Sequence, residues 1–336
     1  KYKEKYFSYS IENARAISSK KAERKPIFDS WHTFSEDTQL NNITLDQLCT
    51  FFSNPIKFFM VHKLGIVIPD KKSLISDAEP FTINRLDKYK LEQKLLEKKI
   101  IQKGNKPLIN SVYSSGTLPH GTPGICTLQE INETVDTFMT ILNKTSIIPQ
   151  KKSFADIDIN FSEINITGRV SFLSKDYLVH YKPAVIKPKD ILYIWLSHLL
   201  LSLSNNDTLP SKSLLIGMES DKTQRCFQYS EVINASSILN KLLNLYNYGL
   251  NRPIHFFPAT SYTYVYEILR GKDNDYAISK AEQEWIGSRF KPGESDNAFY
   301  QIYPGSKLSI SNDCDFIQTA LTVFKPIFEH EEKVQI

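Results

Sequence analysis

Apolar residues recur at intervals of three and four between Leu45 and Phe52, which is the spacing of a helix that buries one face. Thr44 and Gln47 stand before this run with the spacing of a capping box. Pro55 ends the helix, because the residue before a proline avoids the α region, and it also suits the first turn of a second helix. The pattern therefore predicts two consecutive short helices.

A long charged helix is predicted over residues 83–103 and another helix over 125–145, separated by the turn-rich stretch 104–124. We expect residues 43–150 to form a mainly helical part of one domain. Residues 1–42 are polar and lack sustained periodicity, so we interpret them as a linker or the tail of a preceding domain.

The pattern changes after residue 150, where residues 154–161 alternate strictly between apolar and polar and predict a half-buried strand. Further strands are predicted at 163–173, 176–182, 212–218 and 224–228. Helices are predicted at 189–204, 231–249 with Gly249 as the stop, 262–270, 278–288 and 313–328. Residues 151–336 should therefore form a small mixed sheet with helical cover, which makes the fold class mixed α/β.

Composition narrows the class of protein. The 336 residues are 23% charged with a net charge of +4, a weak electrostatic footprint for a free-standing nucleic-acid binder. No apolar stretch reaches the length of a membrane span, and the basic N-terminus lacks the apolar core of a signal peptide. The first residue is not Met, so we expect a fragment of a longer protein. Four scattered cysteines predict reduced thiols and a cytoplasmic location.

Several residues could carry chemistry, and each also has a structural interpretation. Asp156 and Asp158 could hold a metal ion, but alternation with isoleucines favours a solvated strand face. His180 and His198 belong to no metal-binding spacing, so we expect packed or hydrogen-bonded side chains. No phosphate-binding glycine loop of the G-x-x-x-x-G-K-[ST] type occurs, so no nucleotide is expected.

The predicted helix 83–103 carries a dense set of lysines that includes Lys94, Lys98 and Lys99. Interspersed glutamates favour a solvated helix face. The other interpretation is a surface that follows DNA phosphates, and these three lysines are its candidate contacts.

The two strands around residue 175 resemble a known metal-dependent nuclease motif. Nucleases of the PD-(D/E)xK class carry Gly-x-x-Asp on one strand and Asp-x-Lys on the next. Here Gly168 and Lys182 match, but Ser171 and His180 stand at the two acidic positions. Mg²⁺ is bound mainly through carboxylates, so this set of residues should hold no catalytic metal. The resemblance implies a nuclease fold of the RecB-like type that has lost its chemistry.

A wider resemblance covers residues 43–336. The chain is similar to the C-terminal domain of RecC, the gamma chain of exodeoxyribonuclease V. The matching segments are Leu45–Leu64, Glu79–Leu96, Leu118–Gly124, Trp195–Leu199, Pro253–Pro258 and Gly293–Asp296. The resemblance implies a non-catalytic domain of a helicase–nuclease that repairs double-strand breaks, with RecB, RecD and double- and single-stranded DNA as partners.

Iron–sulfur members of the superfamily carry a cysteine before the proline of the opening helix pair, where Asn54 stands here, and Cys314 lacks neighbouring cysteines. We therefore expect no cofactor. One alternative stays open, namely a divergent nuclease that uses Asp156, Asp158 or Glu163. It requires two of these carboxylates to converge beside Lys182.

Overall fold

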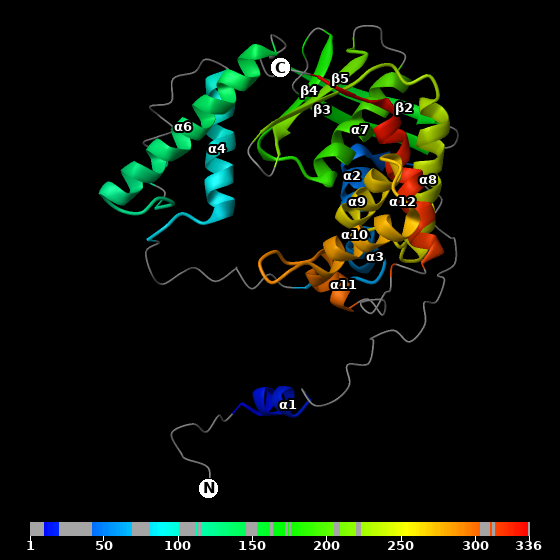
Figure 1. Ribbon diagram of the computed structural model, residues 1–336, viewed down its shortest axis with the longest axis horizontal. Helices are drawn as coiled ribbons and strands as arrows, with labels where there is room; N and C mark the ends of the chain where they lie inside the picture. Colours follow the sequence, from blue (N-terminus) through cyan, green and yellow to red (C-terminus); the bar gives the residue numbers. More distant parts are fainter. Residues whose placement is uncertain are drawn as a thin grey trace.

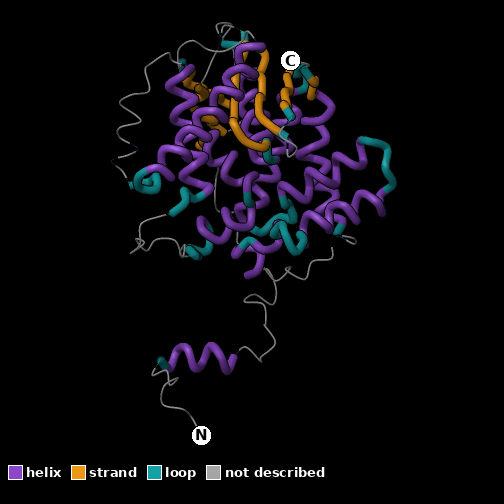
Figure 2. The backbone as a smooth tube through the Cα atoms, turned by 60° about the vertical axis from the view of Figure 1, so that its left-hand side comes forward, coloured by secondary structure: helices purple, strands orange, loops and turns teal. Residues whose placement is uncertain are grey.

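The computed structural model describes the chain in separate stretches. The described residues are 10–19, 42–68, 81–100, 112, 114, 116–145, 153–161, 164–171, 174, 176–204, 209–219, 223–302, 310 and 313–334. They form a mixed α/β structure, as predicted, and helices lie on both sides of the strands (Figures 1 and 2).

The predicted opening helix pair is confirmed as α2 (Leu45–Ser53) and α3 (Pro55–His62). Thr44 and Gln47 form the expected capping box at the start of α2. Two short elements in this region were not predicted. Helix α1 (Ile11–Ser19) falls in the stretch interpreted as a tail, and strand β1 (Asn42–Thr44) directly precedes α2.

The two long predicted helices are α4 (Arg85–Ile100) and α6 (Thr122–Lys144), which pack against each other. The turn at the start of α6 requires glycine at two positions. Gly121 has a φ of +69°, which favours glycine. A Cβ on Gly124 would lie 2.1 Å from the carbonyl oxygen of Pro119, so only glycine fits beneath that turn.

The strands form two small mixed sheets where the sequence predicts one. The first contains β2 (Phe154–Phe161), β3 (Ile164–Ser171) and β1, with β3 in the centre. The second has the order β4 (Tyr177–Val185), β5 (Lys212–Met218), β6 (Gln224–Tyr229) and β7 (Glu331–Lys333). Strands β4 and β5 are parallel, whereas β6 is antiparallel to both of its neighbours.

Helices complete the C-terminal part. They are α7 (Pro188–Leu203), α8 (Ala235–Asn251), α9 (Pro258–Leu269), α10 (Asn274–Ile286), the short η3 (Glu294–Asp296) and α11 (Ala298–Ile302), and α12 (Cys314–His330). The sequence pattern predicts all five of the longer ones, α7, α8, α9, α10 and α12, with shifted ends, and it misses η3 and α11.

The second sheet separates two hydrophobic cores. Val179 and Leu214 on one face pack with the apolar sides of α4 and α6. Leu178 and Leu215 on the other face join a larger core. That larger core also contains residues of α2, α3 and α7, so buried residues from before and after residue 150 pack together.

Helix α8 corrects one prediction. It continues to Asn251 rather than ending at Gly249. A Cβ on Gly249 would lie 2.4 Å from the Phe51 ring, so this glycine permits a close approach of α8 to α2. The role of Gly249 is therefore packing, and not the helix stop that the sequence pattern predicts.

Candidate functional site

Lys182, the residue that still matches the nuclease motif, is engaged in a nearly buried ion pair. Its Nζ lies 2.6 Å from Oδ2 of Asp190, and the two side chains are only 10% and 12% exposed. The pair joins strand β4 to the first turn of helix α7. In this position the lysine neutralises a protein carboxylate rather than facing an open site.

Asp190 is the residue that the sequence analysis missed. Its Oδ2 also accepts a hydrogen bond of 2.8 Å from the backbone N–H of Lys187, just before α7 begins. A carboxylate in this position satisfies a free amide and suits the positive end of the helix. Pro188 at the first helical position followed by an acid two residues later is a recognisable helix-start signal, and it could have directed attention to this residue.

The two substituted motif positions lie on strands of different sheets. His180 is half-buried on β4, and its ring lies 5.2 Å from that of Tyr193 on α7. Burial lowers the pKa of His180 to about 4, so the imidazole is neutral at physiological pH. Ser171 ends β3, in the other sheet, opposite Phe154. A neutral imidazole and a hydroxyl give Mg²⁺ no charge to bind.

Gly168 has a packing role. A Cβ at this position would lie 2.7 Å from Cβ of Leu45, so the glycine lets α2 cross directly over β3. The motif glycine therefore serves the core in this chain.

Two acids of the alternative nuclease hypothesis, Asp156 and Asp158, face solvent. Asp156 and Asp158 are both on the exposed side of β2, as the alternation predicts. Asp156 forms a two-pronged pair with Arg169, at 2.6 and 3.1 Å, and this hydrogen bonding holds the pKa of Asp156 below its ordinary value. Glu163 lies outside the described residues.

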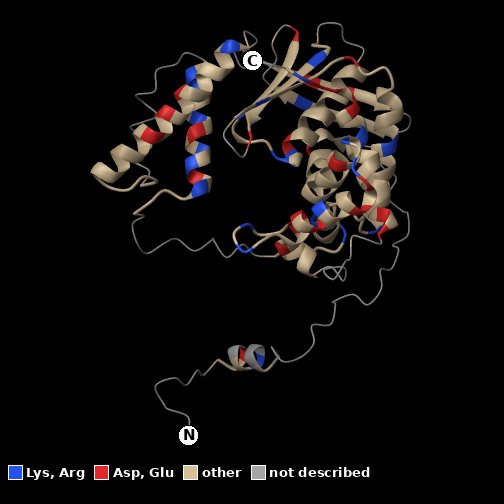
Figure 3. Ribbon diagram, in the orientation of Figure 1, with Lys and Arg blue, Asp and Glu red and all other residues tan. Residues whose placement is uncertain are grey.

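Figure 3 shows basic positions along α4 with acidic positions between them, and the three candidate lysines on this helix differ in exposure. Lys94 is exposed and Lys98 is half-buried. Lys99 lies 2.5 Å from Asp136 on α6, and its side chain is 21% exposed. Lys99 therefore links the two helices, whereas Lys94 is open to a partner.

His198, in the matching segment Trp195–Leu199, also has a structural role. Nδ1 of His198 lies 2.9 Å from the Ser213 hydroxyl, and Nε2 lies 2.9 Å from the carbonyl oxygen of Ser230. The carbonyl can only accept, so Nε2 carries the proton and Nδ1 accepts from Ser213. Burial lowers the pKa of His198 to about 4. The prediction of a hydrogen-bonded core histidine is thus confirmed.

The matching segment Gly293–Asp296 binds the residues that directly follow the matching segment Pro253–Pro258. The carboxylate of Glu294 accepts hydrogen bonds from the Ala259 N–H at 3.2 Å, the Thr260 N–H at 2.8 Å and the Thr260 hydroxyl at 2.8 Å. Phe257, at the start of α9, offers no capping side chain. Glu294 therefore supplies the cap from a distant segment, and burial raises its pKa.

Asn54, at the position of the cluster-binding cysteine, caps α3 by accepting a 2.9 Å hydrogen bond from the Lys57 N–H. The four cysteines lie on four different elements, namely α2, α6, β6 and α12.

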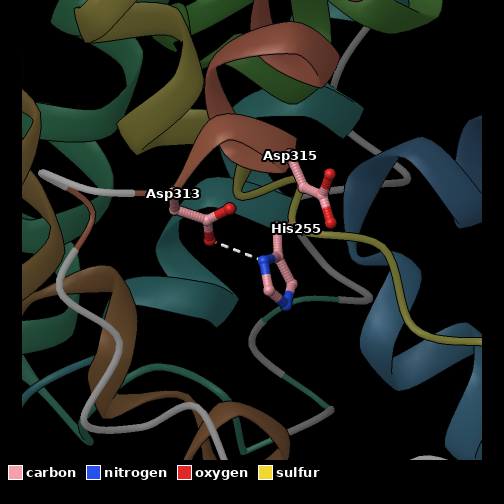
Figure 4. A group of neighbouring side chains, drawn as sticks. All are labelled: His255, Asp313 and Asp315. Atoms are coloured by element: carbon pink, nitrogen blue, oxygen red, sulfur yellow. Dashed lines mark ion pairs between the residues drawn. The ribbon is translucent and has the colours of Figure 1, made fainter.

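Among the described residues, one group brings three potential metal ligands together, namely His255, Asp313 and Asp315 (Figure 4). Nδ1 of His255 is 2.5 Å from Oδ2 of Asp313, and Asp315 is adjacent. The other oxygen of Asp313 accepts from the Phe316 N–H at the start of α12. Burial alone would raise the pKa of Asp313. The hydrogen bonds from His255 and Phe316 together have the larger effect, so the pKa of Asp313 lies below its ordinary value. We interpret this group as a charged helix cap.

A groove of about 790 Å³ lies along α8 and α12. His255 and Asp315 line it, together with polar side chains such as Asn244 and Thr322. Its lining contains none of the four motif residues, so the groove is separate from the motif.

The fold and these contacts define a mixed α/β domain in which two motif positions have structural roles, Gly168 in packing and Lys182 in an ion pair. The sequence matches the family described as the RecC C-terminal domain over residues 40–268, which is more than half of the chain. The chain belongs to this family.

The curated relatives that the chain matches are described alike, as a subunit of the RecBCD enzyme. The chain is 26% identical over 302 residues to the RecBCD enzyme subunit RecC of Buchnera aphidicola subsp. Schizaphis graminum, and the match covers 87% of this chain and 27% of that protein. It is 23% identical over 272 residues to the RecBCD enzyme subunit RecC of Escherichia coli K12, covering 77% and 23%. The chain thus spans about a quarter of the length of the curated relatives it matches.

No helix among the described stretches combines the length and the apolar character that crossing a membrane requires.

We predict that Lys182→Met and Asp190→Asn each lower the free energy of unfolding of the purified chain by about 3 kcal/mol, because each leaves the other group buried without its partner. The double variant Lys182→Met/Asp190→Asn should cost less than the sum of the two single changes, since it removes the pair as a unit. Urea unfolding monitored by circular dichroism measures these values.

The matched control is Arg169→Met, which breaks the exposed pair with Asp156 and should change stability little. Lys182→Met behaving like this control would show that the buried pair has no structural role.

Proposed function

We propose that this chain is a non-catalytic domain of a RecC subunit, with a nuclease-like fold of the PD-(D/E)xK type whose chemistry has been lost. In this proposal the domain is no enzyme by itself. It is part of exodeoxyribonuclease V, a cytoplasmic helicase–nuclease that acts on damaged DNA during repair and recombination. Its role is to hold partner subunits and to guide DNA.

The observation that carries this proposal is the state of Lys182. A nuclease lysine must face the metal and the scissile phosphate to help activate the attacking water. Here its Nζ is 2.6 Å from a carboxylate that also caps helix α7. The charge of the lysine is used to join two elements, which supports a fold retained for its surfaces.

The relatives support the choice of partners. Each is described as the RecC subunit of the RecBCD enzyme, so RecB and RecD are the proposed protein partners. A domain without its own chemistry contributes to such an enzyme through its surfaces. A large assembly of this kind buries more than about 2,000 Å² between subunits.

DNA guidance is assigned to α4, because Lys94 is exposed there and Lys98 is half-exposed on the same helix. Lys99 is assigned a structural role, because its ion pair with Asp136 already satisfies it. This divides the three candidates into two DNA contacts and one link between helices.

We predict that Lys94→Glu/Lys98→Glu in the full helicase–nuclease weakens binding to forked DNA by at least about tenfold and reduces the slope of log affinity against log salt by about two, one for each lost phosphate contact. Fluorescence anisotropy at several salt concentrations measures both quantities. Lys241→Glu/Lys272→Glu, two exposed lysines on and near other helices, is the control. An equal loss in both variants would assign the effect to net charge rather than to α4.

We predict that a full-length RecC subunit without residues 42–334 fails to form a stable complex with RecB and RecD. The measurement is co-expression followed by size-exclusion chromatography and a DNA-unwinding assay. A truncated subunit that still yields a normal complex with normal unwinding would contradict the scaffold role.

A further inference from the structure

A short turn projects from the helical body between α10 and η3, drawn in orange in Figure 1. It spans residues 287–293, and Arg289 and Phe290 are at its tip. Phe290 is 94% exposed, and Ile286 at its base is 67% exposed. A large aromatic side chain in water gains none of the free energy that burial gives, so its position calls for an explanation.

The turn is held rigidly by its own hydrogen bonds. The Ser288 N–H donates to the Lys291 carbonyl at 2.7 Å. The Ser288 hydroxyl accepts from the N–H groups of Phe290 at 3.3 Å and Lys291 at 3.1 Å. Lys291 also pairs with Glu284 on α10 at 2.7 Å. These contacts hold the tip in one conformation before any partner arrives.

Two glycines tie the turn to the core. Gly287 has a φ of +78°, and a Cβ there would lie 2.2 Å from the backbone nitrogen of Gly293. A Cβ on Gly293 would lie 2.3 Å from the carbonyl oxygen of Trp285. Trp285 is buried and packs on Phe257 at 4.3 Å between ring centroids. The tip is therefore fixed relative to the folded domain.

We propose that Phe290 is a preformed anchor that inserts into an apolar pocket on another subunit of the helicase–nuclease, with Arg289 pairing with carboxylates at the rim of that pocket. Aromatic residues and arginine dominate binding energy at protein interfaces, and a rigid side chain loses little entropy when it docks. This inference rests on the proposed scaffold function and assigns it a contact point.

The charges of the turn favour a protein partner over DNA. Glu284 neutralises Lys291, so Arg289 is the remaining positive group of the turn 287–293. One phosphate contact gives little affinity for nucleic acid. The aliphatic Ile286 beside the turn adds apolar surface that fits a protein pocket, and a single positive charge suits an acidic rim.

The test compares full-length RecC subunits carrying Phe290→Ala, Arg289→Ala or the control Phe81→Ala. Phe81 is 93% exposed and precedes α4, so it matches Phe290 in residue type and exposure. We expect Phe290→Ala to weaken assembly with purified RecB and RecD at least about tenfold. Arg289→Ala should weaken it several-fold and reduce its salt dependence, whereas Phe81→Ala should have no effect. Titrations followed by analytical ultracentrifugation measure these affinities.

An affinity of Phe290→Ala within about twofold of the unaltered subunit, or an equal loss with Phe81→Ala, would overturn the proposal. A change confined to self-association of the subunit, or to DNA affinity of the complex, would also overturn it. The deletion of residues 42–334 separates the two levels. If deletion abolishes assembly and Phe290→Ala does not affect it, the scaffold role stands and this anchor is wrong. If deletion has no effect, the scaffold role itself fails.

Discussion

The ion pair between Lys182 and Asp190 links the sheet to the helices that cover it. Strand β4 contributes to both hydrophobic cores, and α7 is a largely apolar helix of the larger one. A buried charge pair is costly to assemble and more costly to break, because removing one partner leaves the other charge without compensation. Lys182 has a carboxylate partner that belongs to the fold, so its charge is compensated without a metal-binding acid at position 171 or 180.

Other residues singled out in the sequence also have structural roles. Gly168 allows Leu45 to approach closely, Gly124 allows the Pro119 carbonyl to approach closely, and Glu294 caps α9 from 34 residues away. The contacts of Gly168 and Glu294 bring together segments that are distant in the sequence, and the contact of Gly124 closes a local turn. They specify the fold through close approach and capping, so the fold alone requires these residues. Function then depends on the exposed surface.

The periodic elements could be predicted from the sequence because burial imposes the period. Strand β2 matches its predicted bounds, and α2 begins at its predicted capping box. Three-residue strands such as β1 and β7 contain no period, so only their partners reveal them. Gly249 was misinterpreted because local sequence does not show that the Phe51 ring would pack against it. Asp190 was missed because motif comparison stops at Lys182, whereas the ion pair joins residues eight positions apart.

The most direct measurement is DNA cleavage by the purified chain in the presence of Mg²⁺ or Mn²⁺, with linear single- and double-stranded substrates. Neutral His180 and Ser171, together with an engaged Lys182, predict no metal-dependent cleavage above a protein-free control. Cleavage that requires the metal and disappears in Lys182→Met, under conditions where that variant remains folded, would contradict this interpretation. It would show that the lysine still acts at a working nuclease centre.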